Sequence, residues 1–406
     1  MTHVDVPYLV SRRASAMRAS EIRELLKLLD RPGMVSFAGG IPDPTLFDLE
    51  SFRKAYESAL AENGSALQYS TSEGYPPLRR WIAQRMSVLG VGCTDDNILV
   101  THGSQQGLDL IGKLFLDPAS TLITEAPTYL GALQSFTAFE PDFMTVRFHD
   151  GEARTNATAA RLIYLVPDFA NPSGRTMSLE EREAALELAH QTDAVLVEDA
   201  AYTDLRYEGE RIPALAALDV AYSGSIEKSR TLYCGTFSKT LSPGLRVGWI
   251  CGPATLIRRL TLIKQAADLH TATINQQVLY SIAEPGFDVA VERACATYAS
   301  RRDLMLDALR RHAPAGVTWT EPAGGLFIWL TLPHGADTAE LLEKAIDRNV
   351  AFVPGKAFFA DGSGSNNMRL SYSLISKAVA DAGIRTLCSV IAEHIHEHSP
   401  AGPKAA

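Results

Sequence analysis

The spacing of apolar residues along the chain switches repeatedly between the period of a strand and the period of a helix. From residue 97 to residue 240, short β-branched runs alternate with stretches in which apolar side chains recur every three or four positions. The predicted strands cover residues 97–101, 121–123, 161–166, 194–198 and 231–234. The predicted helices cover residues 10–30, 49–61, 77–89, 104–116 and 178–190. This alternation predicts an α/β fold whose main sheet is doubly wound and mainly parallel.

The pattern changes after residue 250. It turns helical through residues 276–282, and a long helix is predicted from 287 to 312. Strands predicted at 317–319, 325–330, 351–353 and 368–372, with helices between them, indicate a second, smaller α+β domain. We therefore predict an N-terminal helix and loop (1–48) packed with the small domain, a large domain (49–286), a connecting helix with the small domain (287–398), and a disordered tail (399–406).

Composition and charge exclude several classes of function. The net charge of -9, without a run of Lys and Arg, argues against a nucleic-acid partner or an anionic membrane surface. The five cysteines form no CxxC pair and no metal-ligand spacing with His, so we expect no disulfide framework, no metal site and a cytoplasmic location. Neither a signal peptide nor a run of eighteen apolar residues is present, so we do not expect a membrane span.

One lysine stands at the centre of the stretch from Tyr233 to Trp249, where a predicted strand runs into a turn rich in glycine and proline. Lys239 follows an aromatic residue and a hydroxyl, and Arg246 lies seven residues further on. This arrangement suits a lysine that forms a Schiff base with a cofactor whose phosphate is bound nearby. A single lysine in such a loop is more often a surface residue, so the interpretation depends on its neighbours.

Other polar and aromatic residues follow predicted strands in the same way. In doubly wound sheets, ligands bind beyond the carboxyl ends of the strands. The residues predicted at that edge are Ser104, Tyr129, Asn171, Asp199 and Lys239. Each of the first four has an ordinary alternative: Ser104 and Asp199 can cap helices, Asn171 can be a turn residue, and Tyr129 can be a core side chain.

Together these residues supply what a pyridine aldehyde phosphate needs from a protein. Asp199 would pair with the ring nitrogen, Tyr129 would stack on the ring, and Asn171 and Tyr202 would donate hydrogen bonds to the ring oxygen. The phosphate would be shared by Ser104, Gln105, Ser238 and Arg246. The predicted catalytic residues are Lys239, Asp199 and Tyr202.

Arg369 is the lone charge in the predicted strand at 368–372. A charge in a half-buried strand is costly unless it is paired, and a substrate carboxylate is a natural partner for a planar guanidinium. The alternative is an arginine on an edge strand that faces water.

Five motifs together resemble the fold-type I pyridoxal-phosphate aminotransferases of class I/II. They are Ser238-Lys239-x-Leu-x-Pro-Gly-Leu-Arg246-x-Gly-Trp249, Asn171-Pro-x-Gly174, Asp199-x-x-Tyr202, Gly103-Ser104-Gln-Gln and Met368-Arg369-Leu-Ser-Tyr. Three more stretches are similar to the 2-aminoadipate/kynurenine aminotransferase branch, namely Phe37-Ala-Gly-Gly-Ile-Pro42, Gln68-Tyr-Ser70 and Val353-Pro-Gly-Lys-Ala-Phe-Phe359. The likeness extends over nearly the whole chain.

The resemblance implies pyridoxal 5'-phosphate bound to the large domain and a homodimer with active sites at the subunit interface. Tyr69 would reach the neighbouring subunit's cofactor phosphate, while Gly39 and Arg23 would lie near the substrate. Lys239 would carry a proton between the substrate Cα and C4′ of the cofactor. The implied reaction is a ping-pong exchange of an amino group between an L-amino acid and a 2-oxo acid.

Two alternatives stay open beside amino-group transfer. The motifs specify the cofactor rather than the product, so β/γ-elimination or replacement, oxidation and carbon–carbon bond formation use the same groups. Ala170 stands where the branch usually has glutamine, which leaves the substrate range open. The second alternative, a non-catalytic ligand-sensing module, is disfavoured by intact Lys239 and Asp199. The branch also supplies half of some transcription regulators, and we expect no DNA-binding domain in the short segment before Phe37.

Overall fold

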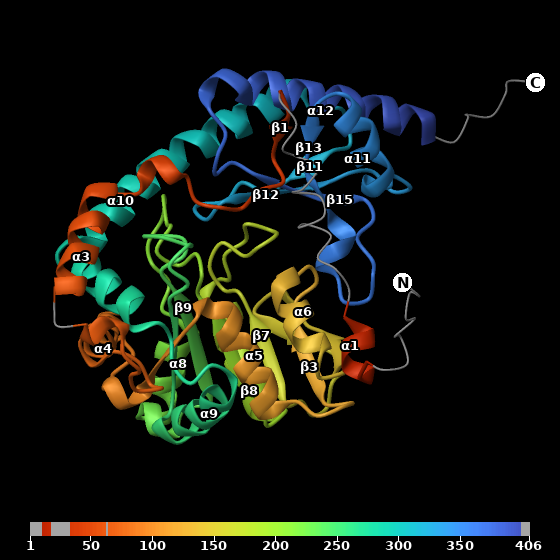
Figure 1. Ribbon diagram of the computed structural model, residues 1–406. Coiled ribbons are helices and arrows are strands. Elements are labelled where there is room, and N and C mark those ends of the chain that lie inside the picture. Colours follow the sequence, from red (N-terminus) through yellow and green to blue (C-terminus); the bar gives the residue numbers. More distant parts are fainter. Residues whose placement is uncertain (1–9, 18–32, 62–63, 399–406) are drawn as a thin grey trace, which may run out of the picture.

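The computed structural model describes residues 10–17, 33–61 and 64–398, and its central feature is a seven-stranded sheet (Figure 1). In spatial order the strands are β2 (Ile98–Thr101), β10 (Gly248–Cys251), β9 (Thr231–Thr236), β8 (Val195–Asp199), β7 (Leu162–Leu165), β3 (Thr121–Thr124) and β4 (Asp142–Thr145). β10 is antiparallel to both neighbours, and the other adjacent strands are parallel. The predicted mainly parallel sheet is confirmed.

Helices cover both faces of this sheet. They are α5 (Gly103–Phe115), α6 (Leu130–Thr137), α7 (Leu179–Gln191), α8 (Leu215–Ser223) and α9 (Ala254–Ala267). Successive residues of a strand point to opposite faces: Leu162 and Val197 pack with α5, α6 and α9, whereas Ile163 and Leu196 pack with α7 and α8. With both faces covered, the loops at the carboxyl ends of the strands are where a ligand can reach the sheet.

A smaller unit contains a four-stranded antiparallel sheet, seen in blue at the top of Figure 1. Its strands, in spatial order, are β11 (Thr318–Trp319), β12 (Phe327–Thr331), β15 (Asn367–Ser371) and β14 (Val353–Pro354). Helices α11 (Thr338–Asp347) and α12 (Lys377–His398) share one hydrophobic core with this sheet. The strand β1 (Val35–Ser36) pairs in parallel with β13 (Val350–Ala351), so the N-terminal segment is attached to the smaller unit.

The helix α10 (Thr273–His312) runs along both units as one element of 40 residues. The sequence predicted two helices, one ending near residue 282 and one starting at 287, but Pro285 lies inside the continuous helix. Packing outweighs the hydrogen bond lost at the proline, because Phe287 lies in a core of the larger unit and Tyr298 in that of the smaller. The domain boundary predicted at 286 stays a prediction. No helix in the described part of the chain is long and apolar enough to cross a membrane.

The helices predicted over 49–61, 77–89, 104–116 and 178–190 are found close to the predicted bounds, whereas α6 and α8 were not predicted and the N-terminal helix differs. Helices α3 (Leu49–Ala61) and α4 (Pro76–Val88) agree with prediction to within a residue or so. The helix predicted over 10–30 begins as α1 (Arg12–Ala16) but stops at Met17, whose extended backbone leaves the helix, and residues 18–32 lie outside the described part. Short 3₁₀ turns are η2 (Pro44–Leu46), η3 (Ser65–Leu67), η4 (Asp95–Asn97), η5 (Ile226–Lys228) and η6 (Gly355–Phe358).

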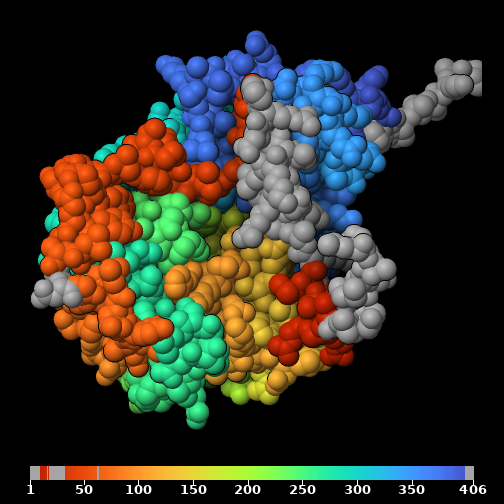
Figure 2. Space-filling model, in the orientation of Figure 1, coloured from red at the N-terminus to blue at the C-terminus, as the bar shows by residue number. Residues whose placement is uncertain are grey.

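Several short strands were not predicted from the sequence. They are β1, β4, β10 and the hairpin of β5 (Arg147–His149) with β6 (Glu152–Arg154). Each of these has only two to four residues, and none contains a run of β-branched residues like those of the predicted strands. The space-filling view shows a hollow between the blue unit and the orange and yellow segments below it, with green segments at its floor (Figure 2).

Candidate active site

Lys239 lies just beyond β9, at the carboxyl edge of the large sheet. Its Nζ donates a hydrogen bond to the backbone oxygen of Gly40, 3.1 Å away, and lies 5.7 Å from the ring centre of Tyr202. Burial, together with the positive charges of Arg369 and Arg246, lowers the pKa of Lys239 to about 8. A larger fraction of the amine is therefore neutral at physiological pH, which is the form that attacks a carbonyl carbon.

The two glycines of the N-terminal loop differ in their surroundings. A Cβ atom on Gly40 would lie 2.8 Å from the Phe327 ring, whereas one on Gly39 would meet no atom within 4 Å. The backbone at Gly40 thus approaches both the smaller unit and Lys239. The sequence pointed to Gly39 as the substrate glycine, and the close contact at Gly40 was not foreseen because it depends on β12, which is distant in sequence.

Asp199 is a buried carboxylate at the end of β8. One of its oxygens, Oδ2, accepts a hydrogen bond from Tyr164 Oη at 2.7 Å. The other, Oδ1, is buried without a hydrogen-bond partner among the described residues. Burial raises the pKa of Asp199 to about 6, despite the hydrogen bond from Tyr164. A protonated pyridine nitrogen supplies the missing donor, so this position fits the cofactor's ring nitrogen.

Sequence reasoning missed Tyr164, although it is the residue that holds Asp199. It lies in the middle of β7, among Leu162, Ile163 and Leu165, where its ring looks like a core side chain. A buried tyrosine hydroxyl generally has a partner, so a tyrosine in an otherwise aliphatic strand was the available signal.

A cradle for an anion lies at the N-terminus of α5. Arg246 Nη1 donates to Ser238 Oγ at 3.3 Å, and Ser238 Oγ also accepts from Thr236 Oγ1 at 2.9 Å. A Cβ on Gly103 would lie 2.5 Å from Arg246 Nη2, so only glycine lets the guanidinium reach the start of the helix beside Ser104. Arg246 forms no ion pair within the described residues. Its cation and the free N–H groups of α5 together fit a phosphate.

The side chain of Gln105 has a different task from the one predicted. Its Nε2 donates to the backbone oxygen of Gly131 at 2.7 Å and to Ser135 Oγ at 2.8 Å, while its Oε1 accepts from Tyr129 Oη at 3.3 Å. These bonds use the amide to hold Tyr129 at the start of α6, so only the backbone N–H of Gln105 remains for a phosphate.

Arg369 and Asn171 meet where the two units face one another. Arg369 Nη1 donates to Asn171 Oδ1 at 2.8 Å, and Nη2 donates to the backbone oxygen of Ala38 at 2.8 Å. The guanidinium carbon lies 4.3 Å from the ring centre of Phe327, and burial lowers the pKa of Arg369 to about 10. No carboxylate pairs with it among the residues that the structure describes, and Nε has no partner. The alternative of a water-facing arginine is therefore wrong.

Tyr202 is buried with its ring against Phe327, at 5.6 Å between ring centres. Burial raises the pKa of Tyr202, so its hydroxyl stays protonated and able to donate. Asn171 Oδ1 accepts a hydrogen bond from Arg369, so the hydrogen bonds that Asn171 can donate come from its amide nitrogen. The side chains of Asn171 and Tyr202 also form a hydrogen bond with each other, so these two donor groups lie side by side.

Two predicted residues do not join this cluster within the described chain. Tyr69 is 79% exposed, and its ring contacts His270 edge-on at 5.9 Å. Arg23 lies outside the described residues. The roles predicted for both stay predictions.

Comparison with known proteins identifies the family. Residues 34–387 match the model of the family described as aminotransferase class I and II. The chain is 40% identical over 403 residues to aromatic-amino-acid aminotransferase 1 of Thermococcus litoralis, with 95% of this chain and 94% of that protein covered. It is 41% identical over 384 residues to 2-aminoadipate transaminase of Thermus thermophilus, with 92% and 94% covered.

Solved structures of aminotransferases are also similar to this chain. The α-aminoadipate aminotransferase LysN of Thermus thermophilus, complexed with N-(5'-phosphopyridoxyl)-L-leucine, gives a TM-score of 0.87 at 38% identity, covering 96% of this chain and 99% of that one. The kynurenine aminotransferase of Pyrococcus horikoshii gives a TM-score of 0.87 at 39% identity, covering 96% and 98%.

The fold and the groups around Lys239 define a pyridoxal 5'-phosphate-dependent transferase of fold type I. The chain belongs to the class I and II aminotransferase family, in the branch of the aromatic, 2-aminoadipate and kynurenine aminotransferases. Its cofactor is pyridoxal 5'-phosphate, and its reaction is the transfer of an amino group between an amino acid and a 2-oxo acid. The family, cofactor and reaction predicted from the motifs are confirmed.

Proposed function

We propose that the amino donors are L-amino acids with large side chains, of the aromatic, kynurenine or 2-aminoadipate type, and that the acceptor is a small 2-oxo acid. The observation that carries the substrate class is Arg369, a buried guanidinium without a carboxylate partner among the described residues. An α-carboxylate matches its planar N–H donors and compensates its burial. The side-chain class is supported by the substrates named for the relatives.

Each site residue has a separate role in the proposed reaction. Bound pyridoxal phosphate supplies a ring that accepts electron density when the bond between the substrate Cα and its hydrogen breaks. Lys239 would carry that proton between the substrate Cα and the cofactor, since its lowered pKa keeps a fraction of the amine neutral. Asp199 holds the ring nitrogen protonated, while Tyr202 and Asn171 donate to the ring oxygen. The phosphate would be held by Ser104, Ser238, Arg246 and the backbone of Gln105.

The proposal is tested by mixing purified protein with a panel of L-amino acids and recording the visible absorbance of the bound cofactor. Phenylalanine, tyrosine, kynurenine and 2-aminoadipate are expected to bleach the band, and 2-oxoglutarate to restore it. The matching amines without a carboxylate, such as phenethylamine and tyramine, are the controls and are expected to react at least about a hundredfold less well, because they leave Arg369 unpaired.

Three results would count against the proposal. If amines and amino acids reacted equally well, the proposed binding of the substrate α-carboxylate by Arg369 would be contradicted. Bleaching only by small amino acids such as alanine would contradict the donor class. Ammonia release or oxygen uptake without formation of a second amino acid would favour elimination or oxidation on the same cofactor.

The protein is proposed to act as a homodimer. Large apolar side chains are exposed on α3, η3 and α10, three elements that contact one another: Leu49 (72%), Leu67 (69%) and Val289 (69%). Tyr69, two residues after η3, is 79% exposed. An exposed apolar patch of this kind is typical of a protein interface, and a second copy of the chain is the occupant that the family resemblance implies. Tyr69 would then complete the partner's phosphate site.

A complementation experiment tests this arrangement. Lys239→Ala and Tyr69→Ala are each expected to lower activity, but co-expressed chains would form hybrid dimers in which one site has both native residues. The mixture is then expected to recover roughly a quarter of the native activity, as random pairing of two chains in a two-fold dimer requires. Activity no greater than the mean of the two separate variants, or a monomeric mass in sedimentation, would contradict the shared site.

A further inference from the structure

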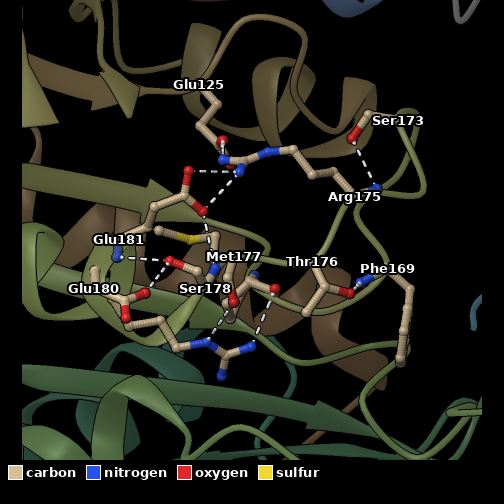
Figure 3. A network of polar contacts seen from close by, with 11 residues as sticks. Glu125, Phe169, Ser173, Arg175, Thr176, Met177, Ser178, Glu180 and Glu181 are labelled. Atoms are coloured by element: carbon tan, nitrogen blue, oxygen red, sulfur yellow. Dashed lines mark hydrogen bonds and ion pairs between the residues drawn. The ribbon is translucent and has the colours of Figure 1, made fainter. Parts of the chain in front are cut away.

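Arg175 joins two loops that leave the carboxyl edge of the large sheet (Figure 3). Its Nη1 donates to both carboxylate oxygens of Glu181, at 2.8 and 2.7 Å, and its Nη2 donates to Glu125 Oε1 at 2.8 Å. Glu125 directly follows β3, and Glu181 belongs to the first turn of α7. The guanidinium therefore connects the β3–α6 loop, the β7–α7 loop and the start of a helix.

Each loop carries a residue assigned to the cofactor ring. Tyr129 lies four residues after Glu125, and Asn171 lies four residues before Arg175. The distance between the two loops determines how the Tyr129 ring and the Asn171 amide stand relative to one another. Arg175 crosses this gap with side-chain hydrogen bonds to both sides.

Backbone hydrogen bonds close the β7–α7 loop around Arg175. Ala170 N–H donates to the backbone oxygen of Arg175 at 2.9 Å, and Gly174 N–H donates to the oxygen of Ala170 at 2.6 Å. A shift of the Arg175 side chain is thus transmitted through a closed ring of hydrogen bonds to the residue next to Asn171. At the far end, Glu181 also accepts from the backbone N–H of Ser178, so its carboxylate is fixed by a capping box.

This network differs from an ordinary surface ion pair. The Arg175 side chain is 39% exposed, but those of Glu125 and Glu181 are only 20% and 15% exposed, and the two η nitrogens of Arg175 each bind a different carboxylate. Burial raises the pKa of Glu125, and the charge of Arg175 opposes that rise. Removal of the guanidinium would leave a poorly solvated carboxyl group beside the loop of Tyr129.

We propose that Arg175 is a positioning residue that sets the spacing between Tyr129 and Asn171 on the two sides of the cofactor ring. The inference rests on the proposed roles of those two residues. Arg175 itself touches neither of them by its side chain, so its effect is on geometry rather than on the reacting atoms.

The test compares Arg175→Gln, Arg175→Lys and Glu125→Gln with the native holoenzyme. The matched control is Arg310→Gln, because Arg310 also bridges two carboxylates, Asp307 and Glu321, but on the surface of α10 away from the sheet edge. Four quantities are measured for each: the visible circular dichroism of the bound cofactor, the cofactor Kd of the apoprotein, kcat with KM, and the melting temperature of the apoprotein.

Arg175→Gln is expected to change the visible dichroism and to lower kcat about ten- to a hundredfold, since a displacement of about 1 Å costs that much, with KM changed less than about threefold. Arg175→Lys should fall between Arg175→Gln and the native protein, because lysine keeps the charge but lacks the bidentate fork. Glu125→Gln should resemble Arg175→Gln, and combining them should add little. Arg310→Gln should match the native protein in dichroism, Kd and kcat.

The inference fails if Arg175→Gln lowers only the melting temperature and leaves dichroism and kcat like those of Arg310→Gln, because a purely structural ion pair gives that pattern. Failure of the proposed function is separate: it would appear in the native chain, as an absent cofactor band or as absent exchange with the amino-acid panel.

Discussion

Replacing Lys239 by alanine is expected to lower kcat by about four orders of magnitude, because the variant loses both the amine that bonds to the cofactor and the group that moves the proton. The pKa of about 8 expected for this amine gives a second signature. The rate of cofactor attachment to apoprotein should rise with pH through about 8, as the neutral amine becomes the dominant form. Both are measured by absorbance, with stopped-flow mixing for attachment.

Lys344→Ala is the control for this substitution, because Lys344 is an exposed lysine of α11 paired with Glu397. It should react as the native protein does. A small primary amine in the buffer should restore part of the turnover of Lys239→Ala, since it can carry the proton in place of the side chain. Native-like turnover of Lys239→Ala without added amine would overturn the assignment of the central lysine.

Replacing Asp199 by asparagine is expected to affect activity and stability in opposite directions. The amide still accepts from Tyr164 but offers no negative charge to the ring nitrogen, and a buried charge without its partner costs about 3–5 kcal/mol. We therefore expect kcat to fall by roughly a hundredfold to several thousandfold. The apoprotein, by contrast, should gain stability, since it no longer has to bury an unpaired carboxylate.

The direction of the pH effect follows from the raised pKa of Asp199. Because this pKa is about 6 in the folded chain and 3.8 in its ordinary state, the folded apoprotein binds more protons than the unfolded chain between these values. Native apoprotein therefore loses stability as pH rises from about 4 to about 6, by about 3 kcal/mol in all. In denaturant unfolding, the free energy of unfolding of Asp199→Asn apoprotein should exceed that of native apoprotein by about 3 kcal/mol at pH 8 and should equal it at pH 4. An unchanged difference across this range would contradict the buried, unpaired state of Asp199.

Most of the large sheet could be predicted from the sequence, because its parallel strands are buried on both faces and read as short apolar runs. β7 and β8 are such strands, and their bounds agree closely with prediction. The antiparallel β10 (Gly248–Cys251) was missed because it has only one β-branched residue, Ile250, and because its pairing with β2 joins segments far apart in sequence. Pro285 led to the wrong prediction of a break between two helices, because its local effect is outweighed by the packing of the continuous helix α10.

The site was predictable where one residue has one chemical task, and less so where a residue acts through its neighbours. Lys239, Asp199 and Arg369 each stand out by residue type and position. Tyr164 and the partners of the Gln105 side chain did not, because their roles depend on hydrogen bonds that close only when separate strands and helices meet. No spacing rule along a chain reports such contacts.

The continuous helix α10 has a consequence for how the protein unfolds. Its first half supplies Leu279 and Phe287 to a core beneath the large sheet, and its second half supplies Tyr298, Met305 and Leu309 to the core of the smaller unit. Loss of either core removes the packing that holds half of the helix, and the remaining half then frays from its new end. The two cores are therefore coupled through a shared helix, and we expect the apoprotein to unfold in one cooperative transition rather than in two.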